Sequence, residues 1–331
     1  SHETRHADVL VIGGGAAGMS AALLVSKRGK QVILVDDQKL LGGRLRFDGN
    51  LYDGISGISP SIGYKIADNL SKLVTRDKNI EVMSRTTAFG LYEGNLIGLI
   101  QGNSKVKLRS GKVILATGTY EQPSTFDRND LPGVMLSTAI QRLIHLQGII
   151  PGRFAVVSTC DDQGYRSALD MLKAGIRIAA IIDSRQQFPN KLLAARELQA
   201  NGVLVLMSHM LIRAEGTKHV VGAAASRLAD GHVTTEEREF DCDLIAMSGG
   251  FQPADSLLRQ AGCELSYDKS IDRMVVSELP DKLYAVGRVF GNDDLGKSIA
   301  HARSIGSVVT EAKPTGNTVS SSDNFMYEGR N

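Results

Sequence analysis

The sequence has few of the features that mark specialised classes of protein. Its 331 residues include only eight prolines and three cysteines. The 38 lysines and arginines nearly balance the 36 acidic residues, so the formal net charge is only +2. This balance gives no sign of nucleic-acid binding or of attraction to a membrane surface. No apolar run approaches the roughly 18 residues of a membrane-spanning helix, so we expect a globular protein without a membrane span.

Cysteine is too sparse and too scattered to support metal or disulfide chemistry. Cys160, Cys242 and Cys263 lie far apart in the chain and form no C-x-x-C motif. They supply neither an iron–sulfur or zinc ligand set nor a redox dithiol, and no metal site is expected. The residues that follow Ser1 show no pattern of an export signal. We therefore expect three reduced cysteines in a cytoplasmic protein.

The start of the chain carries a complete strand–helix–strand pattern. Residues 7–12 form a short apolar run that ends in glycines, 16–28 read as a helix, and 31–35 form a second apolar strand. The turn between the first strand and the helix reads G-x-G-x-x-G, from Gly13 to Gly18. This order is typical of a dinucleotide-binding βαβ unit.

Each glycine of this turn has an expected role. Gly13 permits the tight turn, Gly15 lets a pyrophosphate approach the backbone, and Gly18 allows close packing of helix on strand. The pyrophosphate would meet the unpaired N–H groups of the helix start, at Ala16 and Ala17. A glycine-rich turn without a ligand is the alternative, which the complete pattern disfavours.

An acid follows the second strand at the spacing of a ribose-binding carboxylate. Asp36, with Asp37 next to it, ends the second strand. A carboxylate here accepts hydrogen bonds from ribose hydroxyls and repels a 2′-phosphate, so NADP is disfavoured. Gly42 and Gly43 then let the chain pass close beneath a dinucleotide, and Arg44 is a candidate partner for a phosphate oxygen. Without the first motif, this segment would read as an ordinary turn.

The rest of the chain repeats the alternation of strands and helices. An amphipathic helix is predicted at 61–76, and a second α/β pattern begins after Pro151 and Gly152. Strands are predicted at 80–92, 96–108 and 113–116, with a turn at Ser110 and Gly111, and a hairpin is predicted around 229–231.

The predicted fold is α/β, with two Rossmann-like dinucleotide-binding domains of which the second is inserted into the first. The first domain is placed at 1–150 and 271–312, and the second at 151–270. A final helix at about 295–311 is expected to pack back on the first domain. Residues 313–331 lack periodicity and are read as a tail.

Taken together, the motifs resemble the two-dinucleotide-domain flavoprotein reductases of the FAD/NAD-dependent pyridine-nucleotide oxidoreductase superfamily. More narrowly, residues 7–312 are similar to the dinucleotide-binding region of the alpha subunits of heterotetrameric sarcosine oxidases. Subunits of hydrogen cyanide synthase and of opine or proline dehydrogenases are similar relatives. The most specific match is the run 129–136, and the others are 32–36, 85–90, 116–123 and 247–250.

The resemblance implies a subunit of a multi-subunit amine oxidase or dehydrogenase. Its substrate would be a small amine, and the flavin that oxidises it would be carried largely by a partner subunit, with FMN at a subunit interface as one arrangement. By the same resemblance, the first site holds NAD in these alpha subunits, and Thr87 and Ala88 border the adenine. The matching strand ends also place four further residues at the dinucleotide, namely Ala116, Thr117, Gly118 and Gly287.

Two departures from the flavoprotein pattern stand out. The late strand is followed by Gly287 and Arg288 instead of Gly-Asp, which leaves FAD or NAD undecided; Arg288 would pair with a phosphate or with a nearby acid. In the second turn, Asp161 and Asp162 place two negative charges where a pyrophosphate would lie. We therefore expect the second domain to keep the fold and to lack a working nucleotide site.

The leading hypothesis is a dinucleotide-binding subunit of a flavin-dependent amine oxidoreductase that acts on a secondary or N-methyl amino acid. The alternatives are a self-sufficient FAD-dependent NAD(P)H oxidoreductase and a non-catalytic scaffold stabilised by a nucleotide. No residue stands out as a catalytic acid or base. The single histidines are read as ordinary surface or core residues, namely His145, His209, His219, His232 and His301.

Overall fold

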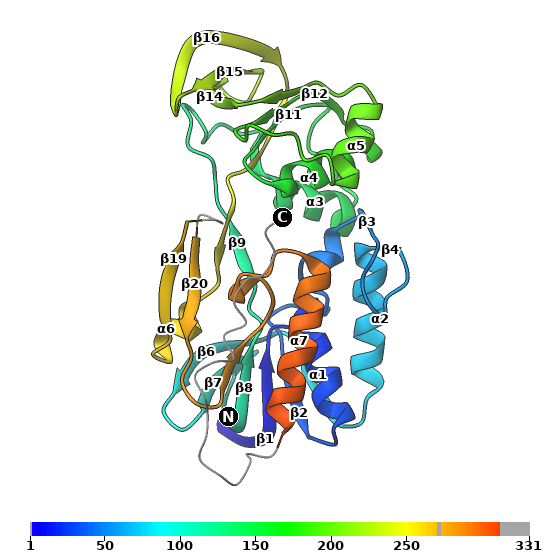
Figure 1. Ribbon diagram of the computed structural model, residues 1–331, viewed down its shortest axis with the longest axis vertical. Helices are drawn as coiled ribbons and strands as arrows, with labels where there is room; N and C mark the ends of the chain where they lie inside the picture. Colours follow the sequence, from blue (N-terminus) through cyan, green and yellow to red (C-terminus); the bar gives the residue numbers. More distant parts are fainter. Residues whose placement is uncertain (1, 270–272, 312–331) are drawn as a thin grey trace.

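The computed structural model describes residues 2–269 and 273–311 and places two α/β domains one above the other (Figure 1). The first domain forms the lower half of this view and the second domain the upper half. The predicted tail at 313–331 lies outside the described residues. Across the described ranges, no helix is both long enough and apolar enough to cross a membrane.

The first domain is built on a seven-stranded sheet with the first strand of the chain at its centre. β1 pairs in parallel with β2 on one side and with β8 on the other. Val9 to Ile12 are buried, as expected for a parallel strand covered on both faces. The strands are β1 (His2–Ile12), β2 (Val32–Val35), β5 (Ile80–Met83), β6 (Thr86–Tyr92), β7 (Leu96–Gln101), β8 (Ser104–Leu115) and β21 (Leu283–Ala285).

Three helices pack on one face of this sheet, α1 (Ala16–Lys27), α2 (Gly63–Arg76) and α7 (Leu295–Thr310). In α7, Ile299 and Ala302 share a buried core with α1, so the final helix packs on the first domain as predicted. The other face is covered by α6 (Ser256–Gln260) and by the hairpin of β19 (Glu264–Asp268) and β20 (Arg273–Glu278).

The second domain has a five-stranded parallel sheet between helices and a three-stranded antiparallel sheet. The predicted hairpin is confirmed, with its turn at Asp230 and Gly231. The parallel strands are β10 (Val134–Leu136), β17 (Leu244–Ser248), β11 (Phe154–Thr159), β12 (Arg177–Asp183) and β13 (Val205–Met207). The helices are α3 (Ser137–Arg142), the π-helix η2 (Leu143–Gln147), α4 (Asp162–Lys173) and α5 (Leu193–Ala200), and the antiparallel strands are β14 (His209–Glu215), β15 (Gly222–Ala229) and β16 (His232–Asp241).

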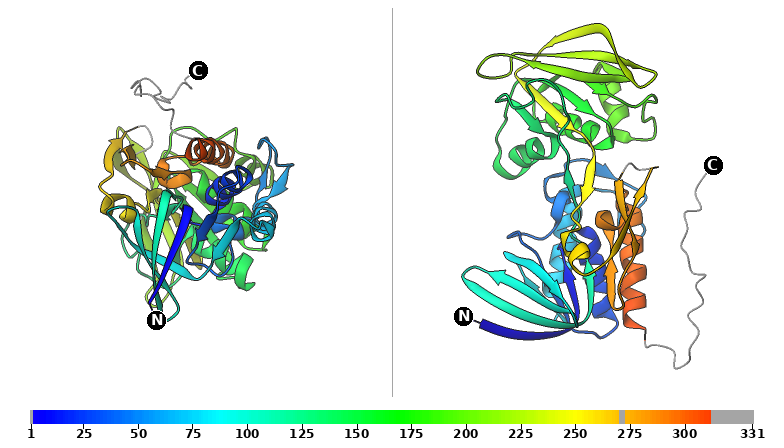
Figure 2. Two further views of the ribbon diagram at one scale, coloured as in Figure 1. Left: turned by 90° about the horizontal axis from the view of Figure 1, so that it is seen from below. Right: turned by 90° about the vertical axis from the view of Figure 1, so that its left-hand side faces the viewer.

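Two antiparallel strands connect the domains, β9 (Thr119–Glu121) on the way up and β18 (Phe251–Pro253) on the way back. Figure 2 shows both segments crossing between the two bodies. This arrangement confirms that the second domain is inserted into the first.

The insertion points differ from those placed by sequence. β10 pairs with β17, and Ile140 of α3 lies in the second domain's core, so that domain begins before residue 150. On the return, Leu258 of α6 is already part of the first domain's core, ahead of the predicted resumption at 271. From the sequence, we placed the start of the second domain at Pro151 and Gly152. In the structure, β10, an edge strand of only three residues, precedes them and already belongs to this domain.

A second correction concerns β8. It runs unbroken through Ser110 and Gly111, where a turn was predicted. A Cβ at Gly111 would lie 2.8 Å from the carbonyl oxygen of Asp8. The glycine therefore marks a close approach of the neighbouring strand β1, which is a common reason for glycine within a strand.

The boundary between the domains is polar and closely packed. The Gly49 N–H donates to Oδ2 of Asp170 at 3.3 Å, and Nδ2 of Asn50 donates to the carbonyl of Arg166 at 3.1 Å. Nε2 of His145 lies 3.1 Å from the same Asp170 oxygen. A Cβ at Gly49 would lie 2.7 Å from both the His145 ring and the Asp170 carboxylate. A larger residue at this contact would have to displace the Asp170 and His145 side chains.

Candidate dinucleotide site

The glycine turn lies at the carboxyl edge of the first sheet, between β1 and α1. Gly13 has φ +108, and a Cβ there would lie 2.3 Å from the carbonyl oxygen of Ala116. A Cβ on Gly18 would lie 1.9 Å from the carbonyl oxygen of Gly13. The turn and the helix contact therefore both require glycine, as the sequence predicted. At Gly15, by contrast, a Cβ would meet nothing within 4 Å, so the space above it is open.

The start of α1 is arranged to receive an anion. Gly15 is its N-cap residue, no side chain caps the helix, and the first turn contains no acid. The first N–H groups of a helix have no partners within the helix and lie at the positive end of its dipole. With the open space above Gly15, this end of α1 suits a pyrophosphate.

Asp36 contacts the glycine turn itself. Its two carboxylate oxygens accept hydrogen bonds from the Gly14 N–H at 2.5 Å and from the Gln38 N–H at 2.8 Å. Burial raises the pKa of Asp36, and these two bonds work in the opposite direction. Each carboxylate oxygen has a further lone pair, so ribose hydroxyls can still donate to Asp36. Asp37, next along the chain, is exposed.

The second glycine pair lies directly against the first turn. Gly42 N–H donates to the carbonyl of Gly14 at 2.8 Å. A Cβ on Gly43, whose φ is +54, would lie 3.1 Å from Cα of Gly15. This close approach places the following 3-10 helix η1 (Gly43–Phe47), and with it Arg44, beside the open space.

Arg44 is a half-buried cation that forms no ion pair among the described residues. Its Nη2 donates to Oε1 of Gln163 at 2.7 Å, and its Nη1 is buried without any hydrogen-bond partner. Its guanidinium lies over the ring of Phe251, 4.1 Å from the ring centre. Burial, and then the nearby charge of Arg288, lower the pKa of Arg44 to about 9. A buried donor left unpaired is costly, so an acceptor bound at this Nη1 would be stabilising.

Arg288 lies near the same aromatic ring as Arg44. Gly287, with φ +78, lets the 3-10 helix η3 (Gly287–Phe290) pack on α1, since a Cβ there would lie 2.8 Å from that of Ala17. The Arg288 guanidinium lies 5.2 Å from the Phe251 ring centre and donates to the carbonyl of Asp293. Within the described part of the chain it forms no ion pair, so the alternative of a salt-bridged arginine is not observed.

The remaining predicted residues lie on neighbouring strand ends. Thr87 and Ala88 are in β6, where the preceding Thr86 N–H donates to the carbonyl of Asp36 at 2.9 Å. Thr117 follows β8, and its hydroxyl donates to the carbonyl of Ala254 at 2.8 Å. Gly118, next in the chain, has φ +76. The start of β6 thus contacts Asp36, and Thr117 and Gly118 follow β8 beside the glycine turn.

The second turn is closed by its own side chains. Gly164 repeats the packing role of Gly18, because a Cβ there would lie 2.4 Å from Cβ of Thr159. Asp161 caps α4 by accepting from the Gln163 N–H at 3.0 Å, and it also accepts from the Ser248 hydroxyl at 2.9 Å. A carboxylate of the protein thus stands at the helix end where a phosphate would bind.

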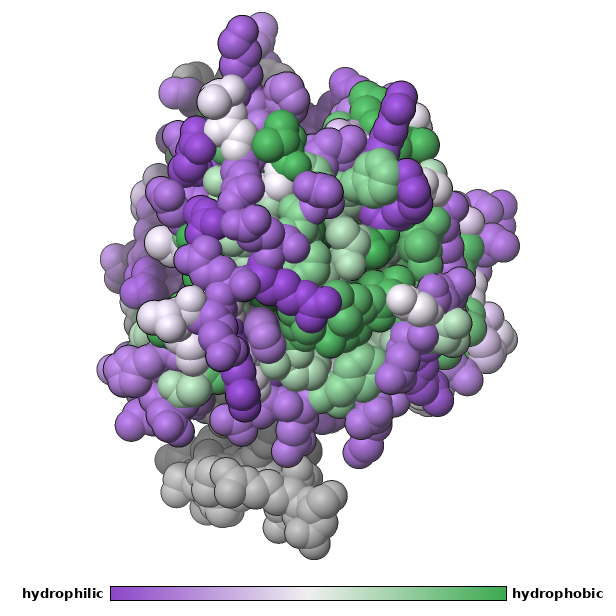
Figure 3. All heavy atoms as spheres, turned by 90° about the horizontal axis from the view of Figure 1, so that it is seen from above, coloured by the Kyte–Doolittle hydropathy of each residue, from purple (hydrophilic) through white to green (hydrophobic). Residues whose placement is uncertain are grey.

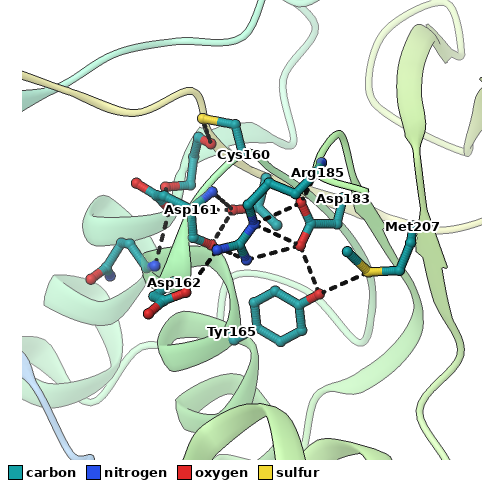
Figure 4. A network of polar contacts seen from close by, with 10 residues as sticks. Cys160, Asp161, Asp162, Tyr165, Asp183, Arg185 and Met207 are labelled. Carbon is teal, nitrogen blue, oxygen red and sulfur yellow. Dashed lines mark hydrogen bonds and ion pairs between the residues drawn. The ribbon is translucent and has the colours of Figure 1, made fainter. Parts of the chain in front are cut away.

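Asp162 was expected to be a second free negative charge in this turn, but in the structure its charge is paired. It forms an ion pair with Arg185 at 2.8 Å. Figure 4 shows Arg185 between Asp162 and Asp183, with Tyr165 beside them. Asp183 is fully buried, is 2.9 Å from Nη2 of Arg185, and accepts from the Tyr165 hydroxyl at 2.8 Å. The acid at the end of β12 is therefore occupied by internal partners.

Two residues of the first site were not found by sequence reasoning. Gln163 gave no signal, because it reaches Arg44 from the other domain, 119 positions along the chain. Phe251 follows a glycine pair that matched the relatives, but nothing indicated that its ring lies near two arginines. The described residues also contain no group of three or more side chains able to hold a metal ion.

The fold and the first turn define a two-domain dinucleotide-binding protein. The model of the pyridine nucleotide-disulphide oxidoreductase family matches residues 7–306, and the chain belongs to this family. It is 33% identical to the alpha subunit of sarcosine oxidase from Rhizobium meliloti (strain 1021), over 75% of this chain and 25% of that relative. It is 28% identical to the corresponding alpha subunit from Corynebacterium sp. (strain P-1), over 94% of this chain and 33% of that relative.

The A subunit of opine oxidase from Agrobacterium tumefaciens (strain Ach5) is 26% identical, over 79% of this chain and 56% of that relative. The chain thus spans about a quarter to a third of the sarcosine oxidase alpha subunits it matches. Among solved structures, L-proline dehydrogenase from P. horikoshii has a TM-score of 0.73 at 19% identity, covering 93% of this chain and 56% of that one. Thioredoxin reductase of T. acidophilum has the same TM-score at 18% identity, covering 92% and 98%. At these identities the structures support the fold.

Proposed function

We propose that the chain is the dinucleotide-binding subunit of a flavin-dependent amine oxidoreductase. Its similarity to the alpha subunits of sarcosine oxidase and to the A subunit of opine oxidase supports this proposal. The substrate would be a secondary or N-methyl amino acid, and a partner subunit would carry the flavin that oxidises it, with FMN held at the interface. The chain's own contribution would be to bind a dinucleotide and to hold the assembly together.

The observation that carries the dinucleotide assignment is the guanidinium of the half-buried Arg44. Its Nη1 lacks an acceptor, and the open space above Gly15 and the uncapped start of α1 lie on the same edge. A pyrophosphate between Arg44 and Arg288 would supply acceptors to both cations. Asp36 would receive the adenosine ribose, and the residues therefore fit an adenine dinucleotide.

We infer that this dinucleotide is NAD. Arg288 stands where flavoproteins of the resembling group have an acid that faces the flavin's ribityl chain, so an FAD would lose that acceptor. The carboxylate of Asp36 disfavours a 2′-phosphate at the adenosine ribose. When bound, the nicotinamide of NAD supplies hydride transfer.

A complex with other subunits is supported by the molecular surface. Figure 3 shows apolar side chains gathered on the end of the molecule formed by the second domain, surrounded by hydrophilic ones. Apolar areas of this kind are typical of contacts between proteins. Met210 and Val233 are exposed apolar residues of the three-stranded sheet in this domain.

A non-catalytic, nucleotide-stabilised scaffold is the second candidate. It is favoured by the second turn, where Asp161 caps α4 and Arg185 is held by Asp183. A self-sufficient reductase that accepts electrons from NADH would need a second nucleotide site, and these contacts argue against one.

Extraction of the ligand from the purified chain tests all three alternatives. We expect an adenine dinucleotide with the mass of NAD and no visible flavin absorbance. We also expect little oxidation of sarcosine or proline with a dye acceptor until partner subunits are added. A flavin bleached by NADH would support the self-sufficient reductase, and activity of the chain alone would contradict the subunit proposal. A tightly held nucleotide that no substrate reduces, even with partners, would support the scaffold.

A further inference from the structure

A small cavity of about 160 Å³ lies at the boundary between the two domains. Residues 50–53 and Asp294, at the start of α7, form its first-domain wall. The second-domain wall comes from α4 and from the segment that leads into α5. Figure 1 shows β3 (Leu51–Tyr52) and the start of α7 at this boundary, on the side facing α4 and α5. None of the lining residues belongs to the dinucleotide site.

The second-domain wall carries positive charge. The Arg166 guanidinium lies 4.9 Å from the ring centre of Tyr52. Over the described ranges, neither Arg166 nor Lys191 forms an ion pair with a carboxylate. Glu197, the acid on this wall, pairs with Lys173 at 3.4 Å. This wall therefore offers two cations without anionic partners.

The start of α5 adds to the same charge. Leu192 is the N-cap residue of α5, its side chain makes no cap hydrogen bond, and the first turn contains no acid. Leu192, Leu193 and Ala194 all line the cavity. Free N–H groups at a helix start attract an anion, most strongly when cations stand beside them.

The first-domain wall carries negative charge and a free acceptor. Asp53 and Asp294 each use one oxygen to accept a backbone N–H, which leaves the second oxygen of each carboxylate available. Asn50 is 2% exposed and lines the same cavity. Its Nδ2 donates to Asp48 and to the Arg166 carbonyl, whereas its Oδ1 is buried without a partner.

We propose that this cavity binds a small zwitterion of the amino-acid class, with its carboxylate toward Arg166, Lys191 and the start of α5. Its ammonium group would lie toward Asp53, Asp294 and the amide of Asn50. Opposite charges on opposite walls match a molecule that carries both. Pockets for drug-sized ligands measure about 300–1,000 Å³, so 160 Å³ restricts the occupant to a smaller molecule.

The ligand would bridge the two domains, and it would therefore stabilise the folded arrangement by mass action. This inference does not rest on the proposed function, since the arrangement of charges alone selects the ligand class. In an amine oxidoreductase complex it would supply a regulatory site at which free amino acid acts apart from the redox centre.

The test is titration of the full 331-residue chain with glycine, sarcosine and proline, by calorimetry and by thermal unfolding. We expect binding of at least one zwitterion and a raised Tm. Acetate and methylamine, which carry one charge each, should bind at least tenfold more weakly. Absence of binding by all three zwitterions, or equal binding of acetate, would overturn the proposal.

Variants locate the ligand. The double variant R166Q/K191Q is expected to weaken binding at least tenfold, and D53N/D294N is expected to do the same from the opposite wall. R166K keeps the charge and should retain most of the affinity, and R196Q removes an exposed charge of α5 that does not line the cavity and should leave binding unchanged. Unaltered affinity in both double variants would place the ligand elsewhere and refute the proposal.

Two controls keep the results interpretable. Each unliganded variant is compared with the unaltered chain by circular dichroism and Tm, so that loss of folding is not read as loss of binding. The dinucleotide content of each variant should equal that of the unaltered chain. Because that content is measured separately, failure of the zwitterion site and failure of the proposed function give different results.

Discussion

At the residue scale, Arg44 combines burial, a neighbouring cation and a missing acceptor. In the folded chain its pKa is lowered to about 9 from 12.5. Because an arginine stays protonated in proteins, this lowered pKa shows that the folded chain disfavours the unpaired charge. A bound phosphate reverses the preference, because it favours the charged guanidinium.

We accordingly expect Arg44 to contribute to the affinity for the dinucleotide, because its Nη1 has no other acceptor. In the variant R44M, affinity should be at least tenfold lower, which corresponds to about 1.4 kcal/mol. Stability without ligand should change little, because removal of an unpaired buried cation relieves a desolvation cost. R142M is the matched control, since Arg142 also stacks on an aromatic ring, that of Phe47, outside the site. Calorimetric titration with the dinucleotide measures the affinity, and urea unfolding of the ligand-free variants measures the stability.

His145 provides a second prediction at this scale. Its contact with Asp170 raises its pKa, its partial burial opposes this, and the charge of Asp48 adds to it. The Tyr64 ring is its neutral neighbour. A raised pKa means that the stabilisation is fully present below the unfolded value, about 6.5, and is lost as the pH rises through the folded value.

H145Q should therefore lower the free energy of unfolding more at acidic than at alkaline pH. Urea unfolding of the variant and the unaltered chain across this range measures the difference. H232Q, a change at an exposed histidine, should show no such pH dependence. Equal destabilisation by H145Q at all pH values would show that the contact with Asp170 is not ionic.

Sequence reasoning found the residues whose role is local and missed those that act across the fold. Gly13, Gly18 and Asp36 follow from the spacing of a single βαβ unit. Gln163 and Phe251 come to Arg44 from segments far along the chain, and only the docking of two domains brings them together. The contact between Asp36 and the turn was also not predicted, because it depends on the backbone path through Gly14.

At the element scale, the unit of β1, the glycine turn and α1 contains two glycines whose replacement by alanine should have different effects. We expect a change at Gly18 to lower stability and a change at Gly15 to lower dinucleotide binding. G18A forces a methyl group against the carbonyl of Gly13, where a Cβ would lie at 1.9 Å. We expect it to lower stability by about 2 kcal/mol or more. Gly15 has φ −72 and open space, so G15A should cost about 1 kcal/mol or less through the weaker N-cap.

The ligand separates the two variants further. The Cβ of G15A would lie where we place the pyrophosphate, so this folded variant should lose the dinucleotide. Urea unfolding and analysis of the co-purified nucleotide measure both properties. A G15A chain that keeps its dinucleotide at the normal level would place the phosphates elsewhere.

The elements that sequence reasoning predicted well are those with a clear period. The βαβ unit, the hairpin at β15 and β16, and α7 appear at the expected places. β10 was missed because three residues give no alternation to recognise. β8 was cut short because Ser110 and Gly111 read as a turn, whereas the glycine there serves a close strand contact. Whether a short segment forms an edge strand, and whether a glycine marks a turn or a close contact, depends on residues that are distant in sequence.

At the scale of the whole molecule, both domains have a turn between a parallel strand and a helix and an acid at the end of the next strand. They differ in the partners of that acid and in whether the turn is open. In the first, Asp36 contacts the glycine turn and the space above Gly15 is open. In the second, Arg185 and Tyr165 hold Asp183, and Asp161 caps α4. The second turn also supplies Gln163 to Arg44, so it supports the first site instead of forming its own.

We therefore expect one dinucleotide per chain, measured by titration of the ligand-free protein with NAD and with NADH. R185M should not create a second site, because it leaves the fully buried Asp183 without its cation. Loss of one partner of a buried pair costs about 3–5 kcal/mol, so R185M should unfold at much lower urea concentration. D162N, which removes only the exposed partner, should change stability by less than about 1 kcal/mol. Two equivalents of bound nucleotide per unaltered chain would show that the second turn still opens, and that Arg185 gates a site instead of closing it permanently.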